Sequence, residues 1–150
     1  MIDQKLFLQI IDTTPLVSID LILLDADKKT LLGKRTNRPA QNYWFVPGGR
    51  IRKNEKLADA IIRISQTELN TSITIKDAQL LGAYDHIYDD NFAAADKINT
   101  HYVALGYQVI VDSNFKLTAD TQHSEFQWWS QDKLLQSKEV HQNTKAYFQN

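Results

Sequence analysis

Runs of apolar and β-branched residues predict several strands in the first third of the chain. The segment LVSIDLILL at 16–24 is typical of a strand, and the polar turn DADKK follows it. The segment TLLGKR at 30–35 is then expected to return as the second arm of a hairpin. After a loop that contains Pro39, WFVPGG at 44–49 is predicted to form a short strand ending in a turn.

The pattern then changes to a helical period over residues 55–69, with Asn54 as the expected N-cap. Three more strands are predicted, at 79–90, 100–111 and 125–130. Short helices are expected near the two ends, at 2–12, 131–137 and 139–148. Because strands and helices do not alternate regularly, the chain is expected to form a mixed α/β (α+β) layered fold.

Composition narrows the class of protein. A chain of 150 residues suits one domain over 1–150, and a net charge of −1 argues against a general nucleic-acid or membrane-surface partner. With no cysteine, disulfides and thiolate metal sites are excluded. The first residues lack a basic region and a long apolar run, so a cytoplasmic location is expected.

The arginines are unevenly distributed. Arginine is suited to a bidentate grip on phosphate or carboxylate. A solvated charged face is the plain alternative, but clustering around a Gly-Gly pair favours an anion site. All five arginines of the chain lie in the segment 35–63, at Arg35, Arg38, Arg50, Arg52 and Arg63.

One acidic residue falls within the apolar stripe of the predicted 55–69 helix. Leu57, Ile61 and Ile64 form that stripe, and Glu68 follows Ile64 by four residues. A buried carboxylate is costly unless a cation or hydrogen-bond donors accompany it. Either the helix ends there and Glu68 reaches water, or Glu68 is a metal ligand. Mg²⁺ is usually held by one or two carboxylates with substrate phosphates and water.

The stretch GGRIRKNEKLADAIIRISQTEL, residues 48–69, resembles the Nudix box, the loop-helix signature of the Nudix hydrolases. Four positions match that box at the correct spacing, namely Gly49, Glu55, Arg63 and Glu68. Three positions depart from it, because two glutamates and the terminal glycine are replaced by Ile64, Thr67 and Asn70. The usual cluster of several Mg²⁺ ions therefore cannot be held in the same way.

The depleted box resembles the GDP-mannose mannosyl hydrolase branch of the Nudix family, and the similarity covers nearly the full length. The segments that carry it are 14–20, 31–50, 88–92, 100–103 and the pair Gln122–His123. The resemblance implies a Nudix fold, with a mixed β-sheet sandwiched between helices. It also implies Mg²⁺-dependent hydrolysis of GDP-mannose, and of GDP-glucose, by C–O cleavage with inversion at the anomeric carbon.

The resemblance further implies a set of metal ligands and a base. One Mg²⁺ per subunit, replaceable by Mn²⁺, would be held by the Gly48 carbonyl, the Glu68 carboxylate and the Gln122 amide oxygen. His123 matches the general base of the branch, and histidine titrates near neutral pH. The other histidines have no such support, and His86 and His101 in strands are explained equally well as residues satisfied by hydrogen bonds.

The remaining site residues concern the GDP-hexose itself. Arg35 is expected to neutralise the leaving phosphate, with support from Arg50 and Arg63; Arg63 is equally explained as a structural partner of Glu55 or Glu68. Arg38 and Arg52 are expected on the surface. Three side chains complete the predicted substrate contacts. Asp20 is expected to contact the mannose hydroxyls, and the alternative is an acid that faces solvent on an edge strand. Tyr88 and Tyr102 are expected to contact guanine and sugar respectively, and the alternative is that both are core aromatics.

The first predicted helix is expected to take part in a homodimer. Phe7, Leu8 and Ile11 are expected to have few local partners, and in this branch residues 1 to about 14 are exchanged across a homodimer.

Hydrolysis of GDP-mannose has two alternatives. A pyrophosphatase that cuts the P–O–P bridge is the second hypothesis, and Ile64 and Thr67 argue against it. A non-catalytic module that binds nucleotide sugars is the third, and the retained site residues argue against it.

Overall fold

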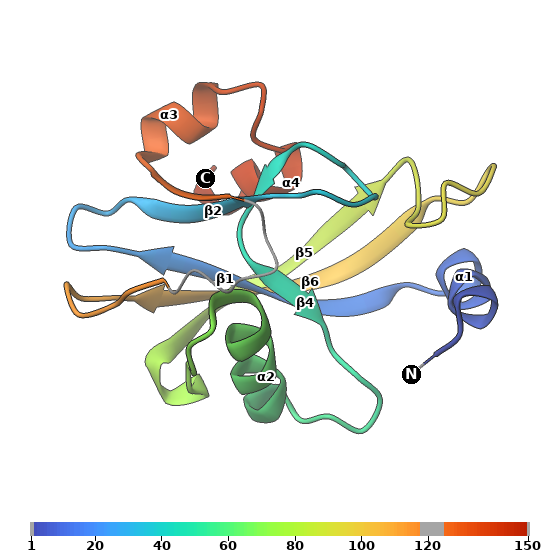
Figure 1. Ribbon diagram of the computed structural model, residues 1–150, viewed down its shortest axis with the longest axis horizontal. Helices are drawn as coiled ribbons and strands as arrows, with labels where there is room; N and C mark the ends of the chain where they lie inside the picture. The colour runs from blue at the N-terminus through green and yellow to red at the C-terminus, as the bar shows by residue number, and fades with distance from the viewer. Residues whose placement is uncertain (1, 118–124, 150) are drawn as a thin grey trace.

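The computed structural model describes residues 2–117 and 125–149. Over these residues the chain forms one mixed sheet with helices on two sides (Figure 1). The strands are β1 (Leu16–Leu24), β2 (Thr30–Lys34), β3 (Trp44–Phe45), β4 (Gly48–Arg50), β5 (Ala78–Tyr88), β6 (Thr100–Ile110) and β7 (Phe126–Trp129). The helices are α1 (Gln4–Thr13), α2 (Leu57–Leu69), α3 (Gln131–Gln136) and α4 (Gln142–Lys145), with 3₁₀ turns η1 (Ile75–Asp77) and η2 (Ala146–Phe148).

Strand β1 is the centre of the sheet. The main path runs β3-β2-β1-β6-β5, while β4 also pairs with β1 and β7 pairs with β2. The β1–β6 pair is parallel, and the other pairs are antiparallel. A residue of β1 therefore has neighbours from two other strands, and Asp20 faces Gly48 of β4 and Gly106 of β6.

The two faces of β1 are buried by different helices, which explains its nearly continuous apolar sequence. Ile19, Leu21 and Leu23 belong to a core that includes Ile61 and Ile64 of α2. The other face, which carries Ile22, packs toward the C-terminal helices in a second core that includes Trp44, Val46, Leu134 and Val140. Figure 1 shows α2 on one side of the sheet and α3 and α4 on the other.

The predicted strands and helices are confirmed, with three local corrections. The helix expected at 139–148 is reduced to the short α4 and the 3₁₀ turn η2, and Val140 forms a β-bridge with Trp44. The segment 44–49 divides into β3 and β4, and Gly48 and Gly49 lie inside β4, paired with β1, instead of in a turn. Helix α2 begins at Leu57, with Lys56 as its N-cap. Asn54 adopts a left-handed conformation with φ 65°, which asparagine tolerates. Asn54 therefore belongs to the turn that precedes the helix and does not cap it.

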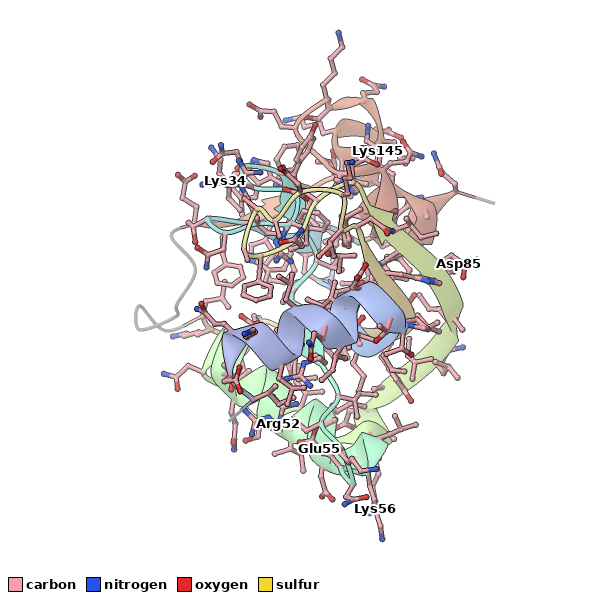
Figure 2. All side chains as sticks on the ribbon, turned by 90° about the vertical axis from the view of Figure 1, so that its right-hand side faces the viewer. Lys34, Arg52, Glu55, Lys56, Asp85 and Lys145 are labelled. Carbon is pink, nitrogen blue, oxygen red and sulfur yellow. The ribbon has the colours of Figure 1, made fainter. Side chains whose placement is uncertain are left out.

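Helix α1 packs against its own chain more closely than expected. Asp3 caps it by accepting a hydrogen bond from the Leu6 N–H at 3.0 Å. Ile11 is buried, and the Phe7 ring lies 5.3 Å from that of Phe92, so the expectation of few local partners is wrong for these two residues. In Figure 2, α1 crosses the front of the molecule. Exchange of this segment across a dimer stays a prediction.

Among the described helices, none has the length and apolar character that crossing a membrane requires.

Candidate active site

Two adjoining cavities lie along β4 and bring most of the predicted site residues together. The larger, of about 340 Å³, is lined by residues that include Arg35, Gly48, Glu68 and Tyr102. The smaller, of about 90 Å³, is lined by Asp20, Arg50 and Tyr88 together with residues of the larger one. The lining residues that both cavities share are Arg35, Phe45, Val46, Gly48, Gly49 and Tyr102.

The position of Gly48 in the ladder explains how its carbonyl becomes available. Hydrogen bonds from Leu21 N–H to Pro47 O (2.8 Å) and from Ile51 N–H to Val17 O (2.9 Å) fix the register of β4 on β1. In this register Asp20 and Gly48 form a non-hydrogen-bonded pair, so the carbonyl of Gly48 points away from β1. The side chain of Asp20 comes so close that a Cβ at position 48 would overlap its Oδ1.

Helix α2 brings a single acid of its apolar stripe to the larger cavity. Ile61 and Ile64 are buried as predicted, whereas Leu57 at the start of the helix is exposed, which corrects the predicted stripe. Glu68 is partly buried and lines the cavity beside Gly48. Thr67 points outward as an exposed residue.

The two other departures from the box also have structural explanations. Ile64 belongs to the core, and its Cγ1 would lie 3.2 Å from a Cβ built on Gly49. Asn70 ends α2 in a left-handed conformation with φ 53°, a position that favours glycine or asparagine. Among residues 2–117 and 125–149, no group of three or more histidine, aspartate or glutamate side chains is arranged to hold a metal ion.

Arg63 occupies the structural alternative that the sequence left open. Its Nε donates to Glu55 Oε2 at 2.7 Å and its Nη2 to Glu55 Oε1 at 2.9 Å. Nη2 also donates to the carbonyl of Arg50 at 2.8 Å, on the outer edge of β4. The Arg63 guanidinium holds the pKa of Glu55 at about 2. Arg63 is not among the described lining residues of either cavity, and its role in substrate binding stays a prediction.

The loop before α2 is tied to the same pair. The Glu55 carboxylate accepts a further hydrogen bond from the Arg52 N–H at 3.0 Å. Figure 2 shows Arg52 and Glu55 close together below α1. Arg52 is exposed, and Arg38 forms an exposed ion pair with Asp90 at 3.3 Å, as their predicted surface positions imply.

The other two predicted arginines rest on aromatic rings beside the cavities. The Arg35 guanidinium lies 5.4 Å from the centre of the Phe45 ring, and its buried Nε has no hydrogen-bond partner in the part of the chain that the structure describes. The Arg50 guanidinium lies 4.9 Å from the centre of the Phe7 ring. Such stacking holds a cation in place while leaving its N–H donors for an anion.

Asp20 is enclosed on an inner strand, so the alternative of a solvent-facing acid on an edge strand is excluded. Its Oδ2 accepts a hydrogen bond from the Tyr147 hydroxyl at 2.7 Å, and His86 Nδ1 lies 3.7 Å away. Burial raises the pKa of Asp20 to about 7, although Tyr147 and Arg35 act in the opposite direction. Burial likewise lowers the pKa of His86 to about 4.

The histidines and tyrosines differ in how well the fold satisfies them. Among the described residues, the Nε2 atoms of His86 and His101 are buried without hydrogen-bond partners, so the expectation that hydrogen bonds satisfy these histidines is not met at this nitrogen. His141 instead caps α4, accepting from the Asn143 N–H at 3.0 Å, and stacks on Phe45. Burial raises the pKa of Tyr88 to about 12 and also raises that of Tyr102.

Two predicted residues, the metal ligand Gln122 and the base His123, lie outside the described residues, so their roles stay predictions. Two residues of the site were missed by the sequence reasoning. Phe45 lies beneath Arg35, and its place in the strand-like WFVPGG segment was the available signal. Tyr147 reaches Asp20 from 127 positions away, and nothing local in the sequence points to that contact.

The fold is that of known Nudix proteins. It superposes on the MutT protein of Methanosarcina mazei with a TM-score of 0.70 and 18% identity, covering 91% of this chain and 92% of that one. It also superposes on the Nudix domain of Shewanella oneidensis NrtR, solved in complex with ADP-ribose, with a TM-score of 0.66 and 20% identity, covering 98% and 90%.

Sequence comparison leads to the family itself. Residues 14–150 match the NUDIX domain. The low-salt glycan biosynthesis protein Agl8 of Haloferax volcanii is 40% identical over 116 residues, which is 77% of this chain and 71% of that protein. The chain therefore belongs to the Nudix family, whose hydrolases act on nucleotide derivatives and generally use a divalent metal.

Proposed function

We propose that this Nudix protein hydrolyses GDP-mannose, and also GDP-glucose, to GDP and free hexose with Mg²⁺. The observation that carries the proposal is the number of acids at the larger cavity: Glu68 is the acid among its described lining residues. The position of a second box acid is taken by Ile64, which is in the core. A box reduced in this way suits one Mg²⁺ on the diphosphate better than a cluster at phosphorus. The glycan-biosynthesis role named for the Haloferax relative supports a sugar-containing substrate.

The residues present fit such an ion. Mg²⁺ takes hard oxygen ligands and keeps part of its coordination for water and substrate phosphates. Glu68 supplies a carboxylate, and the carbonyl of Gly48, turned away from β1, supplies a neutral oxygen beside the same cavity. Gln122 is the third proposed ligand. When bound, the ion would stabilise negative charge on the departing diphosphate.

The remaining chemistry is assigned to side chains of the chain itself. We propose that the His123 imidazole takes a proton from water as the water oxygen bonds to the anomeric carbon. The bond from that carbon to the diphosphate oxygen breaks, and its electron pair leaves with GDP. Arg35 and Arg50, held on Phe45 and Phe7, would offset the charge that GDP gains. Asp20 in the smaller cavity would contact hexose hydroxyls.

Isotope labelling separates this reaction from its alternatives. The protein is incubated with GDP-mannose and Mg²⁺ in ¹⁸O-water, and the products are identified by phosphorus NMR and mass spectrometry. We expect GDP without label and free mannose with label, inverted at the anomeric carbon. Label in GMP or mannose 1-phosphate would instead establish cleavage of the P–O–P bridge. Binding without turnover across several GDP-hexoses would leave a binding module.

A further inference from the structure

We infer that Tyr147, on the C-terminal turn η2, is a positioning residue that fixes the Asp20 carboxylate for recognition of the hexose. This inference rests on the proposed function. Its geometric basis is the hydrogen bond of 2.7 Å from the Tyr147 hydroxyl to Asp20 Oδ2, which joins residues 127 positions apart. The contact brings the end of the chain to the smaller cavity, where Asp20 is a lining residue.

The two oxygens of the Asp20 carboxylate have different surroundings. Oδ2 accepts from Tyr147 and lies 3.7 Å from His86 Nδ1. Oδ1 lies on the side of β4, so close that a Cβ at Gly48 would overlap it. Because Tyr147 holds one oxygen, the carboxylate cannot rotate freely, and Oδ1 stays directed toward the strand that lines both cavities.

The sheet also makes room for Tyr147 itself. Gly106 of β6 pairs directly with Asp20 in the parallel ladder, and a Cβ at this position would overlap the Tyr147 ring. The ring centre of Tyr84 lies 4.5 Å from that of Tyr147, with the planes 62° apart. The Tyr147 ring is therefore confined between a bare strand position and a second aromatic, and its hydroxyl has a defined direction.

A carboxylate oxygen of fixed direction is suited to distinguish hexoses. GDP-mannose and GDP-glucose differ in the orientation of one hydroxyl, and a site discriminates best when a mismatched partner leaves a buried polar group unpaired. If Tyr147 were absent, Asp20 could turn toward either hydroxyl. GDP alone has no hexose, so its binding should not depend on this contact.

The test compares Tyr147→Phe with the matched control Tyr84→Phe, which removes a hydroxyl from the neighbouring ring. For Tyr147→Phe we expect kcat/KM on GDP-mannose to fall by roughly tenfold, as for loss of one buried hydrogen bond. The preference for GDP-mannose over GDP-glucose should narrow, and the inhibition constant of GDP should stay within about twofold. Tyr84→Phe should change none of these values by more than about twofold.

A measurement without substrate accompanies the kinetics. The ¹³C resonance of the Asp20 carboxyl, at one fixed pH and without ligand, should move in Tyr147→Phe and stay in place in Tyr84→Phe. Gly106→Ala, which drives a methyl group into the Tyr147 ring while keeping its hydroxyl, should reproduce the kinetic change. Thermal unfolding of each variant shows whether it is folded.

The outcomes that overturn the inference are distinct from failure of the proposed function. If the wild type releases mannose and Tyr147→Phe matches it, the inference alone is overturned. Equal loss of GDP-mannose turnover and GDP binding would make Tyr147 merely structural and would also overturn it. If the wild-type protein releases no hexose from any GDP-hexose, the proposed function and the inference fall together.

Discussion

Glu55 and Glu68 belong to the same sequence motif, but the structure uses them in opposite ways. Glu55 lies before α2 and gives both carboxylate oxygens to Arg63, which in turn holds the edge of β4 through the Arg50 carbonyl. Glu68 lies in the last turn of α2 and faces the cavity beside Gly48. Matching a motif position therefore does not by itself tell whether an acid supports the loop or serves the chemistry.

The difference follows from where the backbone carries each side chain. Glu55 is positioned by a tight turn, in which its N–H donates to the Arg52 carbonyl at 3.1 Å and its carboxylate accepts from the Arg52 N–H. Glu68 shares the helical stripe of the buried Ile61 and Ile64, which carries it toward the sheet. The first acid stabilises the fold, and we propose that the second binds the metal.

The largest expected effect is on turnover, from Glu68→Gln. Replacing the proposed carboxylate ligand by a neutral amide should lower kcat on the order of 10²–10³-fold, because charge stabilisation of the leaving group is lost. Stability should change little, since the side chain is only partly buried. Steady-state kinetics over a range of Mg²⁺ concentrations, with thermal unfolding as control, tests this. Full activity at saturating Mg²⁺ would contradict the ligand assignment.

A smaller and different effect is expected from Glu55→Gln. The exposed fractions of the Arg63 and Glu55 side chains are only 26% and 14%, so an unpaired arginine should cost roughly 1–3 kcal/mol of unfolding free energy. Turnover should fall much less than in Glu68→Gln. Because the folded pKa of Glu55 is lowered from 4.5 to about 2, its stabilisation is present above pH 4.5 and is lost as pH falls through 2. Denaturant unfolding of both proteins from pH 2 to 7 measures this difference.

The last expected effect is similar in size to that of Glu55→Gln but has the opposite sign, and it concerns a third acid, Asp20. Its folded pKa is raised from 3.8 to about 7, so the folded state binds the extra proton and loses stability as pH rises through that window. Asp20→Asn removes this loss. With 16% of the side chain exposed, the variant should be more stable than wild type by about 2 kcal/mol at pH 8, and equally stable near pH 3. Thermal unfolding at the two pH values tests this; a variant less stable at pH 8 would contradict it.

Much of the architecture was predictable from local patterns. The apolar run at 16–24 and the helical stripe through Ile61 and Ile64 predicted β1 and α2. The reason is that apolar residues recur at the spacing of the positions that face the core. The same stripe indicated Glu68. The Nudix resemblance supplied the fold and is confirmed by the family match over 14–150.

What could not be predicted depends on tertiary contacts between distant positions. The choice of Arg63 between Glu55 and Glu68 is decided by the turn at 52–55, which no periodicity encodes. The contact between Tyr147 and Asp20 requires a C-terminal turn to pack over the centre of the sheet. Asparagine is favoured both as a helix N-cap and at left-handed positions of turns. Asn54 occupies a left-handed turn position, and residue preference alone could not distinguish the two.

One row of the sheet has a consequence for how this protein can diverge. Gly48, Asp20, Gly106 and Gly82 are directly paired across β4, β1, β6 and β5. Asp20 is thus the only side chain beyond a hydrogen in a row of four positions, and larger residues at 48 or 106 would overlap Asp20 or Tyr147. On the proposed function, changes of hexose preference should therefore arise within this row or at Tyr147, and any residue larger than glycine at 48 or 106 should shift Asp20 or Tyr147.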